Sequence, residues 1–166
     1  DIVMGCAFPE GPQGMLMAKG VAILSGLPDT TTGKVVNRFC GSSMDALHQL
    51  SQAINSNDID CGIACGVEDM FGVPMGGFSP SFHPDLYEKE FYMGMGETAE
   101  NLSKELDISR QDQEDFAVNS HKKALDASSK GYFSNEILPV NFNGNTISQD
   151  EGPREPNIEK IQSLDP

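Results

Sequence analysis

The stretch VNRFCGSSMDAL, residues 36–47, runs from a β-like segment through a turn at Cys40 and Gly41 into a helical segment. A side chain at such a strand-to-helix turn is presented outward, and the free N–H groups and dipole of the following helix favour negative charge beside it. The position favours a thiolate at Cys40, and the same N–H groups suit an oxyanion formed when sulfur attacks a carbonyl. The turn by itself fits a small apolar residue at a helix start equally well, so both interpretations of Cys40 stay open at this point.

Short β-like and helical runs alternate over residues 1–70, which is typical of parallel strands joined by crossover helices. This pattern predicts an α/β fold. We expect strands at 2–4, 34–37 and 61–65, and helices at 12–25 and 41–55. The helical period predicts that the first helix is buried through Met15, Ala18, Val21, Ala22 and Leu24, and the second through Met44, Leu47, Leu50 and Ile54.

The sequence pattern changes after Met70. Residues 71–82 are rich in Gly and Pro and follow neither the helical nor the strand period, as in a surface loop. Helices are predicted at 98–106 and 109–129, the second capped by Ser109 and Gly131, and they are followed by a strand at 137–142 and a polar tail. The long helix should line one side with Phe116, Ala117, Ser120, Ala124 and Ala127. We therefore assign residues 1–70 to a core domain and residues 71–166 to a mainly helical loop domain.

The net charge of -14 argues against a nucleic-acid partner, because phosphate binding draws on clustered Lys and Arg. No apolar run approaches the ~20 residues that cross a bilayer, so no transmembrane segment is expected. The chain begins at Asp1 inside a predicted strand, which suggests that the natural N-terminus and any targeting signal are missing. We expect a cytoplasmic location and leave an organellar matrix open.

Three further cysteines, Cys6, Cys61 and Cys65, are expected to be reduced and mostly buried thiols. On one strand Cys61 and Cys65 would lie ~13 Å apart, at ~3.3 Å per residue, whereas a disulfide needs Cα atoms within ~7 Å. The chain has no CxxC or HxxxH spacing of the kind that binds zinc, so no metal site is predicted.

The sequence motifs around Cys40 resemble those of one enzyme family. VNRFCGSSM is similar to the nucleophile motif of the thiolases, and five further stretches continue the resemblance in order: CGVEDM (65–70), VPMG (73–76), MGETAEN (95–101), ISRQDQEDFAVNSH (108–121) and DEGPR (150–154). The ordered set spans nearly the whole chain. It favours the nucleophile over the packing interpretation of Cys40.

The resemblance implies an acetyl-CoA C-acyltransferase, in which a cysteine carries an acyl group between a 3-ketoacyl-CoA and coenzyme A. Cys40 matches the acylated cysteine, and its backbone N–H would contribute to an oxyanion site. Met95 aligns with a position that lines the acyl-thioester pocket, with a merely packing methionine as the alternative. Coenzyme A is a substrate, so the resemblance implies no cofactor. A homodimer or higher homo-oligomer is implied for the full-length protein, although the acidic field requires local donors for anionic acyl-CoA.

The family's remaining catalytic groups lie in Gly-His-Pro, Asn-Glu-Ala-Phe and Cys-x-Gly motifs, and none of these occurs here. His48, His83 and His121 lie outside any such motif. The resemblance therefore implies part of a thiolase-like layered α/β core, its first half, with an inserted mainly helical loop domain. We predict that the chain has no turnover by itself.

The segment VPMGGFSPSFHPDL, residues 73–86, resembles the degradative branch of the family, which acts in fatty-acid β-oxidation. Three alternatives stay open. One is a biosynthetic acetoacetyl-CoA thiolase. Another is a condensing enzyme of the same architecture, but the motifs MGETAEN and SRQDQEDFA favour a thiolase over such an enzyme. The third is a non-catalytic homologue that binds or carries lipids, against which the cysteine at the turn speaks.

Overall fold

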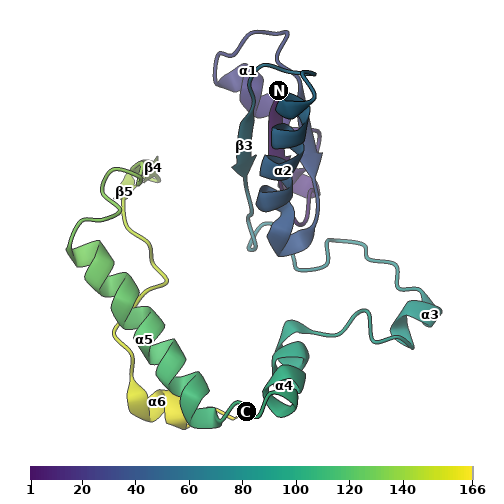
Figure 1. The fold of residues 1–166 in the computed structure, drawn as a ribbon. Helices are drawn as coiled ribbons and strands as arrows, with labels where there is room; N and C mark the ends of the chain where they lie inside the picture. The colour runs from purple at the N-terminus through teal and green to yellow at the C-terminus, as the bar shows by residue number, and fades with distance from the viewer. Residues whose placement is uncertain (166) are drawn as a thin grey trace. The chain divides into compact units, whose positions relative to one another are not determined.

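The computed structural model describes residues 1–165, and the chain divides into two compact units that meet between His83 and Pro84. The first unit holds three strands and two helices: β1 (Ile2–Gly5), α1 (Met17–Leu24), β2 (Gly33–Val36), α2 (Ser42–Asn55) and β3 (Ile63–Gly66). The second holds α3 (Pro84–Tyr87), α4 (Met95–Glu105), α5 (Arg110–Ser129), β4 (Val140–Phe142), β5 (Asn145–Ile147) and α6 (Ile158–Gln162) (Figure 1). Our assignment of residues 1–70 and 71–166 to domains of different role stays a prediction.

The strands of the first unit form a parallel sheet in the order β2-β1-β3, with Met4 opposite both Val35 and Cys65. Parallel neighbours require crossover connections, and α1 and α2 supply them. The predicted α/β class is confirmed for this unit.

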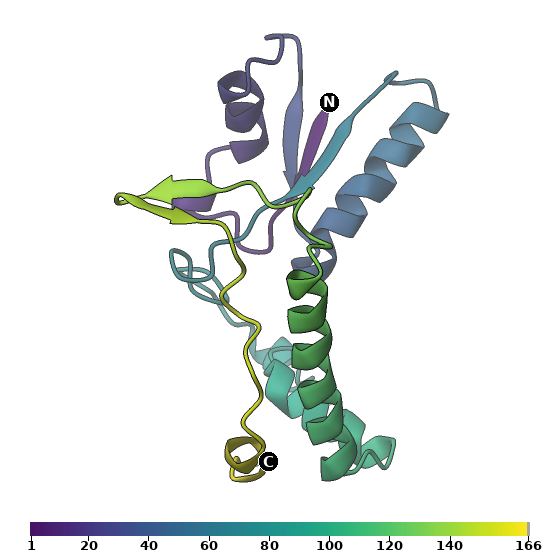
Figure 2. The same cartoon turned by 90° about the vertical axis from the view of Figure 1, so that its left-hand side faces the viewer.

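Successive residues of β1 point to opposite faces of the sheet, and each face is covered by one helix. Ile2 and Met4 are buried with Ala18 and Ala22 of α1, whereas Val3 is buried with α2. Figure 2 shows the resulting layers of the first unit, with α1 on one side of the sheet and α2 on the other. Among the described residues, every buried apolar side chain belongs to this unit.

The predicted buried face was largely wrong for α2 and was confirmed in part for α1. In α2 the buried residues are Ser42, Ala46 and Leu50, one helical turn apart, whereas Met44 is 76% exposed and Leu47 and Ile54 are also exposed. In α1 the predicted Ala18 and Ala22 are buried and Val21 packs against the same cluster, whereas Leu24 is exposed and Met15 lies before the helix and is also exposed. Small side chains occupy most of the buried positions because they let a helix approach the sheet closely. The larger apolar residues lie at the edge of this contact.

The long helix α5 begins and ends almost where the sequence predicts. The Ser109 hydroxyl oxygen accepts the Asp112 N–H at 3.1 Å, and Gly131 has a left-handed φ of +71° after the last turn. Of the residues predicted to line one side, Phe116 is 78% exposed, whereas Ala124 and Ala127 are partly buried. The tail contacts the first turn of the helix, where the Arg110 guanidinium donates to the Leu164 carbonyl at 2.8 Å.

The predicted single strand at 137–142 is a short hairpin of β4 and β5. Its turn residues Asn143 and Gly144 both have positive φ, of +49° and +79°, as a two-residue hairpin turn requires. The Asn-Gly pair was the sequence signal for this turn, and the prediction overlooked it. Within residues 1–165 no helix is both long and apolar enough to cross a bilayer.

Candidate nucleophile site

Cys40 lies in a 3-10 turn, Phe39–Gly41, between the end of β2 and the start of α2, and its side chain is exposed. The residue before it, Phe39, has a φ of +43°. This left-handed conformation costs a residue other than glycine about 1–2 kcal/mol, so it persists only where its surroundings hold it. The sequence predicted a turn at Cys40, and the structure adds a strained residue directly before it.

Two side chains hold this turn through its peptide groups. The hydroxyl of Ser42, which is 3% exposed, accepts the Arg38 N–H at 2.8 Å and donates to the Phe39 carbonyl at 2.6 Å. The Asn37 side-chain oxygen accepts the Phe39 N–H at 2.9 Å. Both polar groups of the Phe39 backbone are therefore bonded to side chains.

The N-terminus of α2 lies against the carboxyl ends of β1 and β3. A Cβ placed on Gly5 would overlap the Ser43 backbone, and one on Gly66 would overlap the Ser43 side chain. These two glycines allow the close approach. Ligand sites of parallel α/β sheets lie at this end of the strands. Cys40 lies at the same end of this sheet.

The charges around the turn are nearly balanced. Asp45 lies in the first turn of α2 and would oppose negative charge on Cys40. The Arg38 guanidinium lies 3.3 Å from the Asp45 carboxylate, with the arginine side chain 72% exposed. Arg38 thus offsets the acidic residue, and the pair leaves no net charge at the turn.

A second cluster at the same end of the sheet was not anticipated from the sequence. The side-chain amide of Gln13, which is 2% exposed, donates to the Phe8 carbonyl at 3.0 Å and to the Glu68 carboxylate at 2.9 Å, and its oxygen accepts the Asp69 N–H. The other oxygen of Glu68 accepts the Ala7 N–H at 2.6 Å. Gln13 thereby joins the loop after β1 to the loop after β3.

These contacts set the ionisation of Glu68. Partial burial opposes its charged form, but hydrogen bonds from the Ala7 N–H and from Gln13 outweigh that effect and lower its pKa. The carboxylate therefore remains ionised at neutral pH and acts as an acceptor.

The four cysteines differ in accessibility, and all are free thiols. Cys6 is buried and Cys65 half-buried, as expected, and burial raises the pKa of both thiols. The prediction was wrong for Cys61, which is exposed and lies just before β3, an edge strand whose own Ile63 is also exposed. Cys40 and Cys61 are therefore the accessible thiols.

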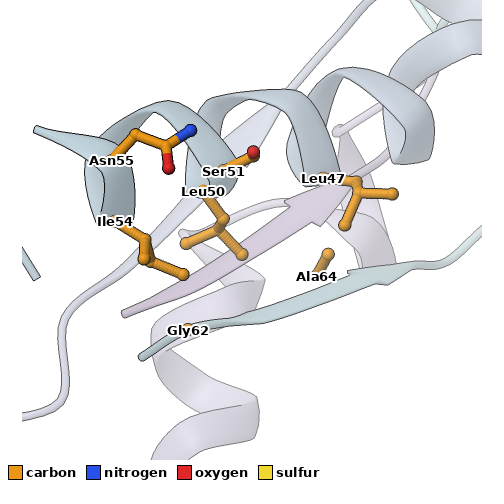
Figure 3. A pocket seen from close by; sticks show the side chains of 7 residues that line it. All are labelled: Leu47, Leu50, Ser51, Ile54, Asn55, Gly62 and Ala64. Carbon is orange, nitrogen blue, oxygen red and sulfur yellow. The ribbon is translucent and has the colours of Figure 1, made fainter. Parts of the chain in front are cut away.

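An apolar groove lies between α2 and β3, away from Cys40. It is lined by Leu47, Leu50, Ser51, Ile54, Asn55, Gly62 and Ala64. Figure 3 shows the leucine and isoleucine side chains spaced along α2 beside Ala64 of β3 and Gly62, which directly precedes that strand. No ionisable side chain lines this groove, so it offers no acid or base for chemistry.

Met95, the other predicted site residue, is the first residue of α4 and is 68% exposed. It belongs to the second unit, whereas Cys40 belongs to the first, and its role in an acyl pocket stays a prediction. His48 is exposed on α2, and the His121 ring nitrogen accepts the Arg154 N–H at 3.3 Å. Within the described residues no group of three or more His, Cys, Asp or Glu could hold a metal ion.

Comparison with known proteins gives a consistent result over the whole chain. The family model for the thiolase N-terminal domain matches residues 1–166. A 3-ketoacyl-CoA thiolase of Bacillus subtilis is 41% identical over 93% of this chain and 40% of its own length. Proteins of the same name from Aliivibrio fischeri and Shewanella baltica are 44% and 40% identical, over 84% and 100% of this chain and 36% and 45% of theirs. The chain thus spans about two fifths of the length of these curated relatives.

Proposed function

Since this chain belongs to the thiolase family, as its N-terminal domain, we propose that the protein containing it is a degradative acetyl-CoA C-acyltransferase. It cleaves 3-ketoacyl-CoA with coenzyme A to acetyl-CoA and a shortened acyl-CoA, as a step of fatty-acid β-oxidation. The observation that carries the proposal is Cys40, an exposed thiol at a held turn in front of a helix, in a chain similar to 3-ketoacyl-CoA thiolases.

The reaction proceeds in two transfers. The Cys40 thiolate attacks the 3-keto carbon, the C2–C3 bond breaks, and the departing enolate takes up a proton to become acetyl-CoA. The thiol of coenzyme A then loses a proton and attacks the acyl-cysteine carbonyl. The carbon–sulfur bond to Cys40 breaks, which releases the shortened acyl-CoA and restores the thiolate.

The local geometry supports part of this chemistry. Each attack develops negative charge on a carbonyl oxygen, and donors aimed at that position supply the largest stabilisation. We assign this role to the Cys40 N–H, in the turn directly before α2, and the exposed Arg38 next to it, which is paired with Asp45, is within the same turn region for contact with the anionic thioester.

Other parts of the mechanism are assigned outside the nucleophile turn. The base that activates coenzyme A and the groups that stabilise the enolate belong to the part of the relatives that this chain does not span. Residues 71–166 form the loop domain inserted into the core and cover the substrate, with Met95 in the acyl pocket. The active protein is a homodimer or higher homo-oligomer that needs no cofactor, and it works in the cytoplasm or an organellar matrix. The names of the relatives do not favour a non-catalytic lipid carrier.

The test uses the full-length protein that carries this chain. Incubation with 3-ketoacyl-CoA but no coenzyme A should add one acyl group to the peptide containing Cys40, as measured by mass spectrometry. Thiolysis of acetoacetyl-CoA and of a longer 3-ketoacyl-CoA should be lost in Cys40→Ser and kept in Cys61→Ser, the other exposed cysteine. Turnover by Cys40→Ser, or by residues 1–166 alone, would contradict the proposal.

A further inference from the structure

Asn37 bonds to two segments of the first unit at once. Its side-chain oxygen accepts the Phe39 N–H at 2.9 Å, and its side-chain nitrogen donates to the Ala7 carbonyl at 2.9 Å. Ala7 lies in the loop after β1, and Phe39 directly precedes Cys40. The Asn37 amide therefore ties the nucleophile turn to the neighbouring strand.

The backbone N–H of Ala7 extends this connection to the loop after β3. The Ala7 N–H donates to a Glu68 oxygen at 2.6 Å, and the buried Gln13 amide holds the other Glu68 oxygen at 2.9 Å. The relay formed by Glu68, Ala7, Asn37 and the Phe39 N–H thus begins at a carboxylate anchored in the loop after β3. Glu68 holds the N–H of Ala7 and Asn37 holds its carbonyl, so the anchored carboxylate fixes the position of the residue to which Asn37 bonds.

The relay ends at a residue with a strained backbone. Phe39 has a φ of +43°, and a residue in this conformation returns to an ordinary one unless its surroundings hold it. A return would rotate the peptide between Phe39 and Cys40. It would redirect the Cys40 N–H and the thiol together.

We propose that Asn37 and Glu68 are positioning residues for the reaction of Cys40, because their relay holds Phe39 in the left-handed conformation that presents the thiol and its N–H. The inference rests on the proposed function, in which Cys40 is the nucleophile. Neither side chain touches the substrate; both act through the turn.

The first experiment compares Asn37→Ala with wild type in the full-length protein, with Asn55→Ala, an exposed asparagine at the end of α2, as the matched control. Folded Asn37→Ala should lose about tenfold in the rate of Cys40 alkylation by iodoacetamide and in kcat, the effect of one hydrogen bond, while KM changes less than about twofold. Asn55→Ala should match wild type. A wild-type alkylation rate in folded Asn37→Ala would overturn the inference.

The second experiment uses Asn37→Asp, which keeps the acceptor for the Phe39 N–H but changes the donor. An ionised aspartate offers nothing to the Ala7 carbonyl, whereas its acid form donates an O–H there. The alkylation rate relative to wild type in the same buffer should therefore rise as the pH falls through the titration of this carboxyl. A ratio that does not change with pH would count against the relay.

The Glu68 end is tested by two variants that differ in one acceptor. Glu68→Gln retains an oxygen for the Ala7 N–H, whereas Glu68→Ala does not, so alkylation of Cys40 should fall further in the alanine variant. Equal wild-type rates in both would remove Glu68 from the relay. If wild type cleaves no 3-ketoacyl-CoA while Cys40 alkylation still depends on Asn37, the proposed function fails and the positioning role stands.

Discussion

Replacing Ser42 with alanine should destabilise the fold through the nucleophile turn. The Ser42 hydroxyl is buried and makes two hydrogen bonds, to the Arg38 N–H and to the Phe39 carbonyl. Each is worth about 0.5–1.5 kcal/mol net, and alanine recovers up to about 0.5 kcal/mol through its better helix propensity. We therefore expect the free energy of unfolding to fall by about 0.5–3 kcal/mol.

Equilibrium urea unfolding of the full-length protein measures this change. Ser51→Ala is the matched control, because Ser51 is exposed on the same helix and should change stability by less than about 0.5 kcal/mol. Alkylation of Cys40 in the folded Ser42→Ala protein should also slow, since the Phe39 carbonyl loses its side-chain donor and keeps only the backbone N–H of residue 42. Equal stabilities of Ser42→Ala and Ser51→Ala would refute the argument that this hydroxyl holds the turn.

Three further outcomes are expected. Limiting iodoacetamide should label Cys40 before Cys61, although both are exposed, because Cys40 alone stands at a helix N-terminus; peptide mapping that finds Cys61 first would contradict this. Gly5→Ala should lower stability by about 1–3 kcal/mol or more in a denaturant titration, because its Cβ would overlap the Ser43 backbone, and a neutral effect would show that α2 can move away. The folded state lowers the pKa of Glu68, so the stability that its charge contributes is present above the unfolded pKa and is lost as the pH falls through the folded pKa. The difference in stability between wild type and Glu68→Gln should therefore close on acidification. A difference that does not change with pH would exclude the charge as its cause.

Local sequence patterns were sufficient for most of the elements. The strand at 33–36 and the helix at 42–55 lie within about one residue of their predicted bounds, because β-branched runs and helical periods act over short stretches. The hairpin at 140–147 was missed although its Asn-Gly turn was readable. The choice of buried stripe failed for a different reason. The helical period allows either Met44 or Ala46 to lie on the buried face. The close approach of the helix to the sheet leaves room only for the smaller Ala46, and this distance is not visible in the sequence.

The sequence by itself determined the α/β order of the first unit, the family, and Cys40 as the residue at the strand-to-helix turn, since all three are properties of neighbouring residues and ordered motifs. Only the tertiary structure decided what holds that turn. Glu68 lies 61 residues from Ala7, and Asn37 lies 30 residues from it, and no local pattern relates them. They meet because parallel strands end at the same edge of a sheet, which brings the loops after β1, β2 and β3 together and lets their polar groups bond.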